Sequence, residues 1–338
     1  MSLATPFTDL FGLDHPVAQA PVGSVTCPAL AGAVSEVGGL GSLAVTWRPP
    51  DATRRSIRTT RDLTDAPFAV NLALDDATVQ FPTDDHLDAC LDAGAPIVAF
   101  SFGDPAPYVD RVHDAGALAL AMVGSAEAAR DAAEAGVDCV VAQGAEAGGH
   151  LDSEVSTVAL VPRVADAVDV PVLAAGGITD GRGLAAALAL GADGAYLGTR
   201  FVATEEALSH PEYRRLLLNA DETATVRTDC FDGGWPGRDH RVLRNSTVDA
   251  WETAERPTSG DRPGEGETVA SIGDYDIARY DDDPPLSVAE GDAEAMALYA
   301  GQGVGGVGEV VPAGEVVEEL VDGTEAVVDR LHTTRSDR

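Results

Sequence analysis

Short apolar runs recur along the chain at intervals of roughly two dozen residues, and each is followed by an alanine-rich segment with helical spacing. Eight such runs are present, at residues 17–21, 40–45, 68–72, 96–102, 117–123, 138–143, 171–175 and 194–198. Because the runs are nearly continuous rather than alternating, they are typical of parallel strands that are buried on both faces. Eight strand-helix units predict a closed (β/α)8 TIM barrel, with a doubly wound open sheet as the alternative.

Capping residues support two of the helices between the runs. Ser125 precedes a helical segment that reaches Ala135, and its hydroxyl can accept from free backbone N–H groups of the first turn. Asp180 can cap a second helical segment, 182–190, which Gly191 then ends. At these two places the helix prediction rests on capping chemistry as well as on periodicity.

The repeat stops after the eighth run. Residues 203–290 contain several prolines and the acidic run 281–283 but few periodic stretches. This pattern predicts an insertion, or lid, between strand eight and the closing helices. We therefore expect a single domain, 1–338, in which 1–202 and 291–332 form the barrel.

Helical spacing returns after the insertion. We expect helices at 292–302 and at 313–331, which would complete the outer ring. The last residues, 333–338, are predicted to form a frayed tail.

The charge of the chain excludes several classes of partner. All 22 basic residues are arginine, whereas aspartate and glutamate number 56, which gives a formal net charge of −34. Such a surface repels nucleic acids and anionic membranes. Its self-repulsion is screened over a Debye length of about 3 Å at 1 M salt, which favours a salt-rich, halophilic cytosol over an ordinary acidic protein. The absence of lysine also excludes a Schiff-base aldolase.

The cysteines and the hydropathy pattern indicate the compartment. Cys27, Cys90, Cys139 and Cys230 show neither CxxC pairs nor zinc spacing, so we expect no disulfide framework and no metal. No run of about 18 apolar residues and no leader pattern is present. The expectation is a cytoplasmic protein.

Glycine-rich turns follow the last two predicted strands, where TIM barrels commonly bind phosphate. Strand seven runs into Gly176 and Gly177, and strand eight into Gly198 and Thr199. Glycines let backbone N–H groups close on phosphate oxygens, and a threonine hydroxyl adds a donor. A phosphate site is the favoured interpretation, and glycines that only make tight turns are the alternative.

Strands six and three end in polar residues. After strand six, Gly148 and Gly149 would let the backbone lie against a planar ring system, with His150 as the nearest titratable group. Gln143 can offer an amide to polar ring atoms. Asn71 on strand three either caps a turn or faces the site. A solvated or structural role is the alternative for the histidine.

Three strings in this order resemble one family. QGAEAGGH at 143–150, AAGGITDGRG at 174–183 and GTRF at 198–201 are similar to the nitronate monooxygenases, formerly called 2-nitropropane dioxygenases. Residues 20–43 resemble the first βα unit of that family, and YAGQGVG at 299–305 resembles its closing segment. Members of this family are flavin-dependent barrels that hold FMN. Flavin-dependent enoyl-ACP reductases share much of the pattern.

The resemblance implies roles for individual residues. His150 would be the catalytic base. The residues that would bind FMN are Ala20, Pro21, Asn71, Gln143, Gly148, Gly149, Gly176, Gly177, Tyr196, Leu197, Gly198 and Thr199. Segment 228–246 resembles the lid of a subgroup, and its Phe231, Gly233, Gly234, Trp235, Arg238, His240 and Asn245 are candidates to touch substrate or to be structural. Leu151 and Asp152 depart from the family pattern after the histidine.

The implied activity is FMN-dependent oxidation of alkyl nitronates by molecular oxygen, with neutral nitroalkanes as an open extension. The first alternative is an enoyl-ACP reductase-like oxidoreductase that uses NAD(P)H on the same flavin site. A flavin-free phosphate-binding lyase or isomerase and a non-catalytic flavin carrier are the others. The sequence leaves the oligomeric state open.

Overall fold

The computed structural model describes residues 3–78 and 80–336, and its centre is a ring of eight parallel strands. Each predicted apolar run contains one of these strands, except that β3 extends one residue past its run: β1 Val17–Gln19, β2 Gly41–Ala44, β3 Phe68–Ala73, β4 Ile97–Ser101, β5 Leu118–Val123, β6 Cys139–Gln143, β8 Val172–Ala175 and β9 Gly194–Leu197. The strand order is β1-β9-β8-β6-β5-β4-β3-β2, and a parallel bridge between Ala18 and Leu40 closes the ring. The TIM barrel prediction is confirmed, and the open-sheet alternative is wrong.

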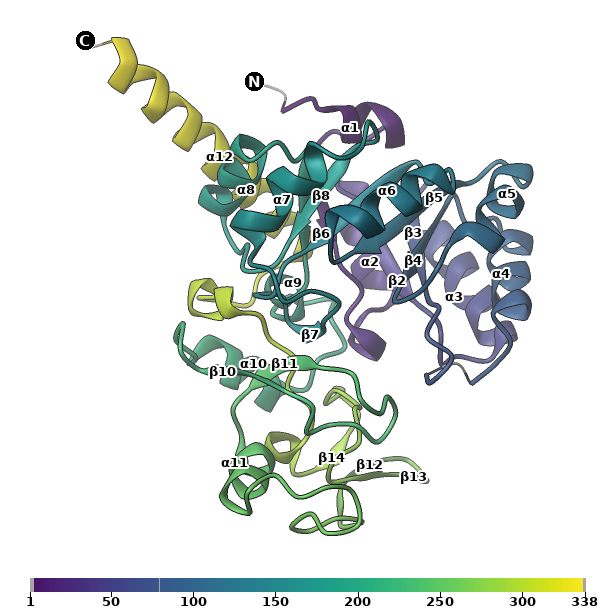
Figure 1. The fold of residues 1–338 in the computed structure, drawn as a ribbon, viewed down its shortest axis with the longest axis vertical. Helices are drawn as coiled ribbons and strands as arrows, with labels where there is room; N and C mark the ends of the chain where they lie inside the picture. The colour runs from purple at the N-terminus through teal and green to yellow at the C-terminus, as the bar shows by residue number, and fades with distance from the viewer. Residues whose placement is uncertain (1–2, 79, 337–338) are drawn as a thin grey trace.

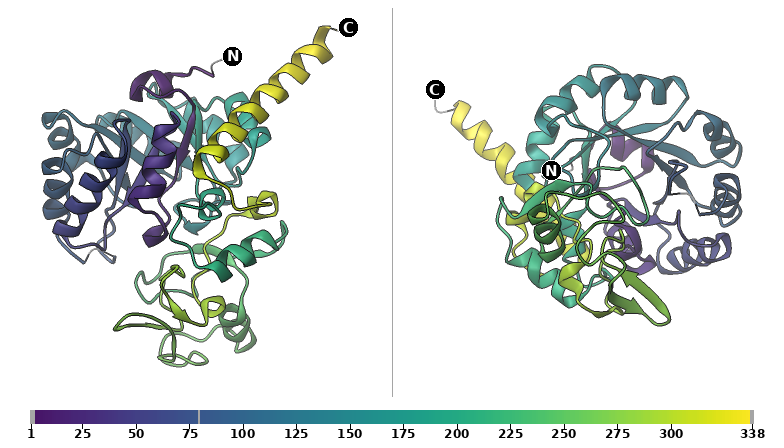
Figure 2. Two further views of the ribbon diagram at one scale, coloured as in Figure 1. Left: turned by 180° about the vertical axis from the view of Figure 1, so that it is seen from behind. Right: turned by 60° about the horizontal axis from the view of Figure 1, so that its bottom comes forward.

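Helices surround the strands, as the right-hand view of Figure 2 shows, which looks toward one end of the barrel. They are α2 Pro28–Glu36, α3 Pro50–Leu63, α4 Thr83–Asp92, α5 Ala106–Asp114, α6 Ala126–Glu134, α7 Thr157–Ala165, α8 Gly181–Ala189 and α12 Ala313–Ser336. The two predicted caps are confirmed. Ser125 accepts from the N–H of Ala128, and Asp180 accepts from those of Arg182 and Gly183.

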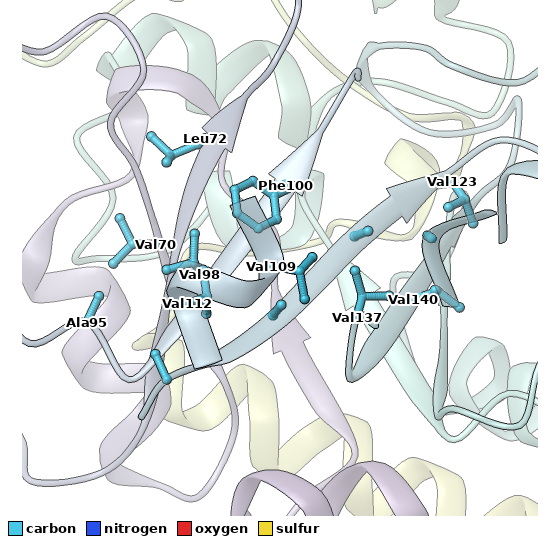
Figure 3. Packing of buried hydrophobic residues seen from close by; sticks show 14 of the residues in the cluster. Val70, Leu72, Ala95, Val98, Phe100, Val109, Val112, Val123, Val137 and Val140 are labelled. Atoms are coloured by element: carbon cyan, nitrogen blue, oxygen red, sulfur yellow. The ribbon is translucent and has the colours of Figure 1, made fainter. Parts of the chain in front are cut away.

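Alternating strand residues divide the core into two layers. On β4, Val98 and Phe100 pack outward with Val109 and Val112 of α5, within the cluster drawn in Figure 3. Ile97 and its neighbours of the same face point into the barrel and form a separate apolar cluster. The barrel interior is therefore filled with side chains over most of its length.

A short helix that the periodicity did not predict closes one end of the barrel. Helix α1, Pro6–Phe11, begins at a capping box on Thr5 and ends at Gly12 in the left-handed conformation. Phe7 and Phe11 are buried in the interior cluster. The amino-terminal end of the strands is thus sealed, which leaves the opposite end for a site.

The insertion forms a lobe below the barrel in Figure 1. The short helix α9, Thr199–Val202, leads into it from β9. The helices and strands of the lobe are α10 Pro211–Leu218, β10 Thr225–Thr228, β11 His240–Leu243, α11 Ser246–Thr253, β12 Thr268–Ile272, β13 Tyr275–Ala278 and β14 Glu290–Gly291, which ends one residue past the predicted boundary. Strand β11 also pairs with β7, Gly149–His150, which follows barrel strand β6. The lobe is therefore joined by hydrogen bonds to the carboxyl-terminal end of the barrel.

The predicted helix at 292–302 is wrong. Short 3-10 turns lie at Gly23–Val25, Ala293–Ala295 and Gln302–Gly306, and the chain between the last two is extended. The extended stretch is bound to β11, because the N–H of Leu243 donates to Leu298 and the N–H of Ala300 donates to Arg241. Pairing with a distant strand has overridden local helical spacing.

The final helix is longer than predicted. Helix α12 continues through residues 333–336, where a frayed tail was expected, and residues 337–338 lie outside the described residues. Its first half packs against α8 and α2. Figure 1 shows its second half, in yellow, pointing away from the barrel.

Candidate active site

A cavity of about 550 Å³ opens at the carboxyl-terminal ends of the strands. All thirteen residues that the sequence singled out line it: Ala20, Pro21, Asn71, Gln143, Gly148, Gly149, His150, Gly176, Gly177, Tyr196, Leu197, Gly198 and Thr199. They come from five different strand ends, which only a closed barrel brings together. The volume of the cavity is within the usual range for small-molecule and cofactor sites.

Small side chains create this space. Where the strands end, the inward positions carry alanines such as Ala73, Ala99 and Ala175, all of which line the cavity. Asn71 lies among them and donates to the carbonyl of Ala99 and to the hydroxyl of Ser101. It therefore faces the site, and the capping alternative is wrong.

Glycines allow backbone segments to meet at the wall of the cavity. A Cβ on Gly148 would lie 2.5 Å from the backbone nitrogen of Gly301, and one on Gly303 would lie 2.6 Å from the carbonyl oxygen of Gly177. Gly176 and Gly177 have φ of 119° and 71°, which L-residues with side chains rarely adopt. The loops after β6 and β8 and the segment 299–303 thus form one close-packed cradle.

Thr199 links this cradle to strand β9. Its Oγ1 accepts from the N–H of Gly301 at 2.9 Å, so its own hydroxyl proton is available to a ligand. None of the described residues that line the cavity is an arginine. A phosphate here would therefore depend on backbone N–H groups and this hydroxyl.

Gln143 fixes the loop that carries His150. Its side-chain amide donates to the carbonyl of His150 at 3.1 Å and accepts from the N–H of Asp152 at 3.0 Å. The buried guanidinium of Arg241 donates to the carbonyl of Ala145 in the same loop. The polar atoms of Gln143 are engaged by backbone, so this side chain orients the histidine loop in addition to lining the cavity.

His150 lies within an aromatic cluster that comes from the insertion and the closing segment. Its ring centroid is 4.2 Å from that of Trp235 and 5.4 Å from that of Tyr299. The Tyr299 hydroxyl lies 3.3 Å from Nε2 of His150 and donates to the carbonyl of Asp282 at 2.9 Å. Its oxygen therefore accepts from Nε2–H. Nδ1 then carries the lone pair, and it is buried without a hydrogen-bond partner among residues 3–78 and 80–336.

Burial lowers the pKa of His150 well below 6.5, and His240 and Arg238 lower it further. Asp75 opposes this shift. The ring is consequently neutral near pH 7, and its Nδ1 lone pair accepts no hydrogen bond from the described residues. A general base must be in this unprotonated form. His150 is a candidate base because its ring is uncharged and one ring nitrogen is unprotonated.

His240 supports the ring from behind. The two histidines are cross-strand partners on β11 and β7, with ring centroids 5.5 Å apart. Nδ1 of His240 bonds to the carbonyl of Arg238, and its Nε2 accepts from the N–H of Phe231. Both nitrogens are used in the neutral form, and burial lowers its pKa. His240 is therefore a structural neighbour of His150 and not a second base.

The mouth of the cavity is bridged by a contact between the insertion and the barrel. Asp75, in the loop after β3, accepts from the indole of Trp235 at 3.0 Å and pairs with Arg238 at 2.5 Å. Arg238 also pairs with Asp152 and lies over the ring of Phe102. Trp235 is thereby held beside His150.

The lid motif divides into two groups in the structure. Gly233, Gly234 and Trp235 line the cavity. Asn245 instead caps α11 and donates to backbone carbonyls, and Phe231 is buried in the core of the insertion. The first group is placed to touch a ligand, and the second is structural.

Sequence reasoning missed part of the cavity wall. Asp281, Asp282 and Asp283 line it, although an acidic run in so acidic a chain has the signature of a solvated loop. The sequence indicates Tyr299 only as part of the segment YAGQGVG at 299–305. The structure shows its hydroxyl at the histidine.

Other findings concern metals, cysteines and membranes. Within the described part of the chain, no three His, Cys, Asp or Glu side chains are grouped to hold a metal ion. All four cysteines are buried and unpaired as disulfides. None of the helices in residues 3–78 and 80–336 combines the length and apolar character that a bilayer crossing needs.

Comparison with known families identifies the chain. The family model described as nitronate monooxygenase matches residues 4–86 and 77–323. The chain belongs to the nitronate monooxygenase family. Among nitronate monooxygenases, that of Paraburkholderia phytofirmans is 35% identical over 95% of both chains. Membership of this family makes the protein an oxidoreductase.

Relatives that carry other names are similar to this chain to about the same degree as the nitronate monooxygenases are. A Mycobacterium tuberculosis protein, (3aS,4S,5R,7aS)-5-hydroxy-7a-methyl-1-oxo-octahydro-1H-indene-4-carboxyl-CoA dehydrogenase, is 38% identical over 76% of this chain and 70% of its own. FabK from Thermotoga maritima has a TM-score of 0.81 at 34% identity, over 98% of this chain and 99% of its own. A nitroalkane oxidase from Streptomyces ansochromogenes has a TM-score of 0.78 at 32% identity, over 97% and 100%.

Proposed function

We propose that this protein catalyses the FMN-dependent oxidation of alkyl nitronates by molecular oxygen, in the cavity at the carboxyl-terminal ends of the strands. The observation that carries the proposal is a neutral, buried His150 beside a glycine cradle in a barrel of the nitronate monooxygenase family. A small nitro compound and oxygen are the proposed partners. A reducing cytoplasm agrees with four unpaired cysteines.

The cavity suits a flavin mononucleotide. The backbone at Gly176, Gly177 and Gly198 and the hydroxyl of Thr199 would hold the phosphate, since a glycine has no Cβ to keep an anion from its N–H group. Gly148 and Gly149, with Asn71 and Ala20, would lie along the ring system. When bound, the flavin would accept the electrons of the substrate and pass them to oxygen.

The protein's own groups supply orientation and proton transfer. Gln143 and the pairing of β7 with β11 hold the backbone of His150, while Tyr299 holds Nε2. Nδ1 of the ring, which is buried in the structure, would accept a proton from the α-carbon of a neutral nitroalkane once the substrate displaces the groups that cover this atom. Trp235 packs against the ring, with the two ring centroids 4.2 Å apart, and helps to hold its orientation. A preformed nitronate needs no such proton transfer.

The purified protein provides the test of this proposal. We expect a yellow protein that releases FMN, and not FAD or free riboflavin, on denaturation. We also expect ethylnitronate to cause oxygen consumption. Gly177→Asp places a carboxylate where the phosphate would bind and should abolish flavin retention. A Gly177→Asp protein with full FMN content would overturn the assignment of this site.

A second candidate is reduction of an enoyl thioester by NAD(P)H on the same flavin site. It is favoured by the CoA thioester in the name of the mycobacterial relative and by the match to FabK over 98% of the chain. The two candidates differ in the electron donor that the flavin accepts. Oxygen consumption that requires NADH and ignores nitronates would favour this alternative.

A further inference from the structure

Asp282 places a carboxylate next to His150 on the cavity wall. Its Oδ2 lies 3.8 Å from Nε2 of His150, and the Asp282 side chain is only 24% exposed. Gly234 makes room for it, because a Cβ at that position would lie 2.0 Å from Oδ1 of Asp282. A largely buried carboxylate costs stability unless a cation compensates it, so its position beside a base invites a functional explanation.

The neighbouring carboxylates of the acidic run are directed to other partners. The hydroxyl of Tyr275 donates to Asp283 at 3.0 Å, and the backbone N–H of Ala278 donates to Asp281 at 2.7 Å. Of the three aspartates, it is Asp282 that meets the imidazole. The three aspartates of residues 281–283 therefore have different partners, and only the carboxylate of Asp282 is next to His150.

No positive side chain offsets Asp282 within the cavity. Arginine is absent from the described residues of its wall, and the chain contains no lysine. Arg238, the cation that acts on His150, is already paired with Asp75 and Asp152 at 2.5 and 3.0 Å. The fixed charge at this end of the cavity is negative.

We infer that Asp282 is a specificity-determining residue, which makes the site favour a neutral nitroalkane over a preformed nitronate anion. The inference deepens the proposed function and rests on it. In the reaction, the C–H bond at the α-carbon breaks, the proton goes to the imidazole of His150, and the electron pair stays on the substrate as the nitronate. The nitronate is then formed inside the cavity, and a preformed nitronate from solution is oxidised less efficiently.

Charge decides the preference. Proton transfer converts a neutral imidazole into an imidazolium, whose positive charge the adjacent carboxylate stabilises. An incoming nitronate brings a negative charge toward the same carboxylate and is repelled. A unit charge a few ångströms away at the polarity of a protein site alters each rate by about tenfold or more, in opposite directions.

The test compares two substrates on one variant at a fixed KCl concentration. Asp282→Asn should lower kcat/KM for nitroethane by about tenfold and raise kcat/KM for ethylnitronate by about tenfold. The ratio of the two should change by roughly 100-fold. A purely structural defect would lower both values together, and that result overturns the inference, as does an unchanged ratio.

Two further variants complete the design. Gly234→Ala would displace the carboxylate of Asp282 without altering the net charge, and should change the ratio in the same direction. It also keeps the inference testable if Asp282→Asn does not fold. Asp276→Asn removes one charge from β13 at an exposed residue that does not line the cavity, and serves as the matched control with an unchanged ratio. Equal effects of Asp276→Asn and Asp282→Asn would show that only net charge matters.

The outcomes separate this inference from the proposed function. A wild-type protein that oxidises neither nitroethane nor ethylnitronate refutes the proposed function itself. A wild-type protein that oxidises at least one of them, with an Asp282→Asn variant whose ratio is unchanged, refutes only the role of Asp282.

Discussion

Gly148→Ala should break the cradle at its tightest point. The added Cβ would lie 2.5 Å from the backbone nitrogen of Gly301 and 2.6 Å from the carbonyl carbon of Ala300. Carbon contacts prefer about 3.5–4.0 Å, so the closing segment must move by about 1 Å. Overpacking of this kind costs about 1–3 kcal/mol, and loss of the Gly301 bond to Thr199 adds about 0.5–1.5 kcal/mol. We expect the free energy of unfolding to fall by about 2–4 kcal/mol.

Gly116→Ala, just after α5 and not part of the cavity wall, is the matched control. Nothing lies within 4 Å of its added Cβ, so only the left-handed backbone, at a φ of 78°, opposes the substitution, at about 1–2 kcal/mol. The cradle should stay closed. After exhaustive dialysis in KCl, Gly148→Ala should have lost most of its flavin absorbance, and Gly116→Ala should have kept it. Equal retention by the two variants would refute the reasoning.

Three other predictions concern catalysis, pH and salt. His150→Asn cannot accept a proton, so it should lose about 10²-fold or more in kcat/KM on nitroethane while keeping most activity on ethylnitronate; equal losses on both would indicate a binding role. Burial, together with Asp283 and Asp281, raises the pKa of Asp282 to about 6, so its charge opposes folding above that pH. Asp282→Asn should therefore raise the free energy of unfolding at pH 7 by about 1–3 kcal/mol, and the gain should shrink as the pH falls from about 6 to about 4 in denaturant titrations; a gain that grows with acidity contradicts it. The midpoint of thermal unfolding should rise between dilute buffer and molar KCl because the charge of −34 is then screened, and a flat response would refute the halophilic interpretation.

The barrel could be predicted because each strand and each helix leaves a pattern in its own short segment of the sequence. Each parallel strand is buried on both faces and so appears as a continuous apolar run, and caps such as Asp180 mark the helix that follows. The glycine turns were visible for the same reason, since close backbone approach requires glycine at that position in the sequence. All thirteen predicted site residues accordingly line one cavity.

The remaining features depend on partners that are distant in the sequence. Strand β7 exists because β11, about ninety residues later, pairs with it, and the extended segment before Gly301 exists because the same strand binds it. Asp282 gave no signal, because one carboxylate among 56 acidic residues is marked only by the ring it meets in the fold. The histidine could be singled out from the sequence as the candidate base, whereas its tyrosine and aspartate neighbours required the structure.

Anaerobic mixing of the flavin-loaded protein with ethylnitronate tests the central claim most directly. The proposed oxidation requires the nitronate to deliver its electrons to the bound flavin without any other reductant. Stopped-flow absorbance should show rapid bleaching of the oxidised flavin by ethylnitronate, recovery of the colour on admission of oxygen, and slow bleaching by NADH. Rapid bleaching by NADH with no response to ethylnitronate would contradict the account.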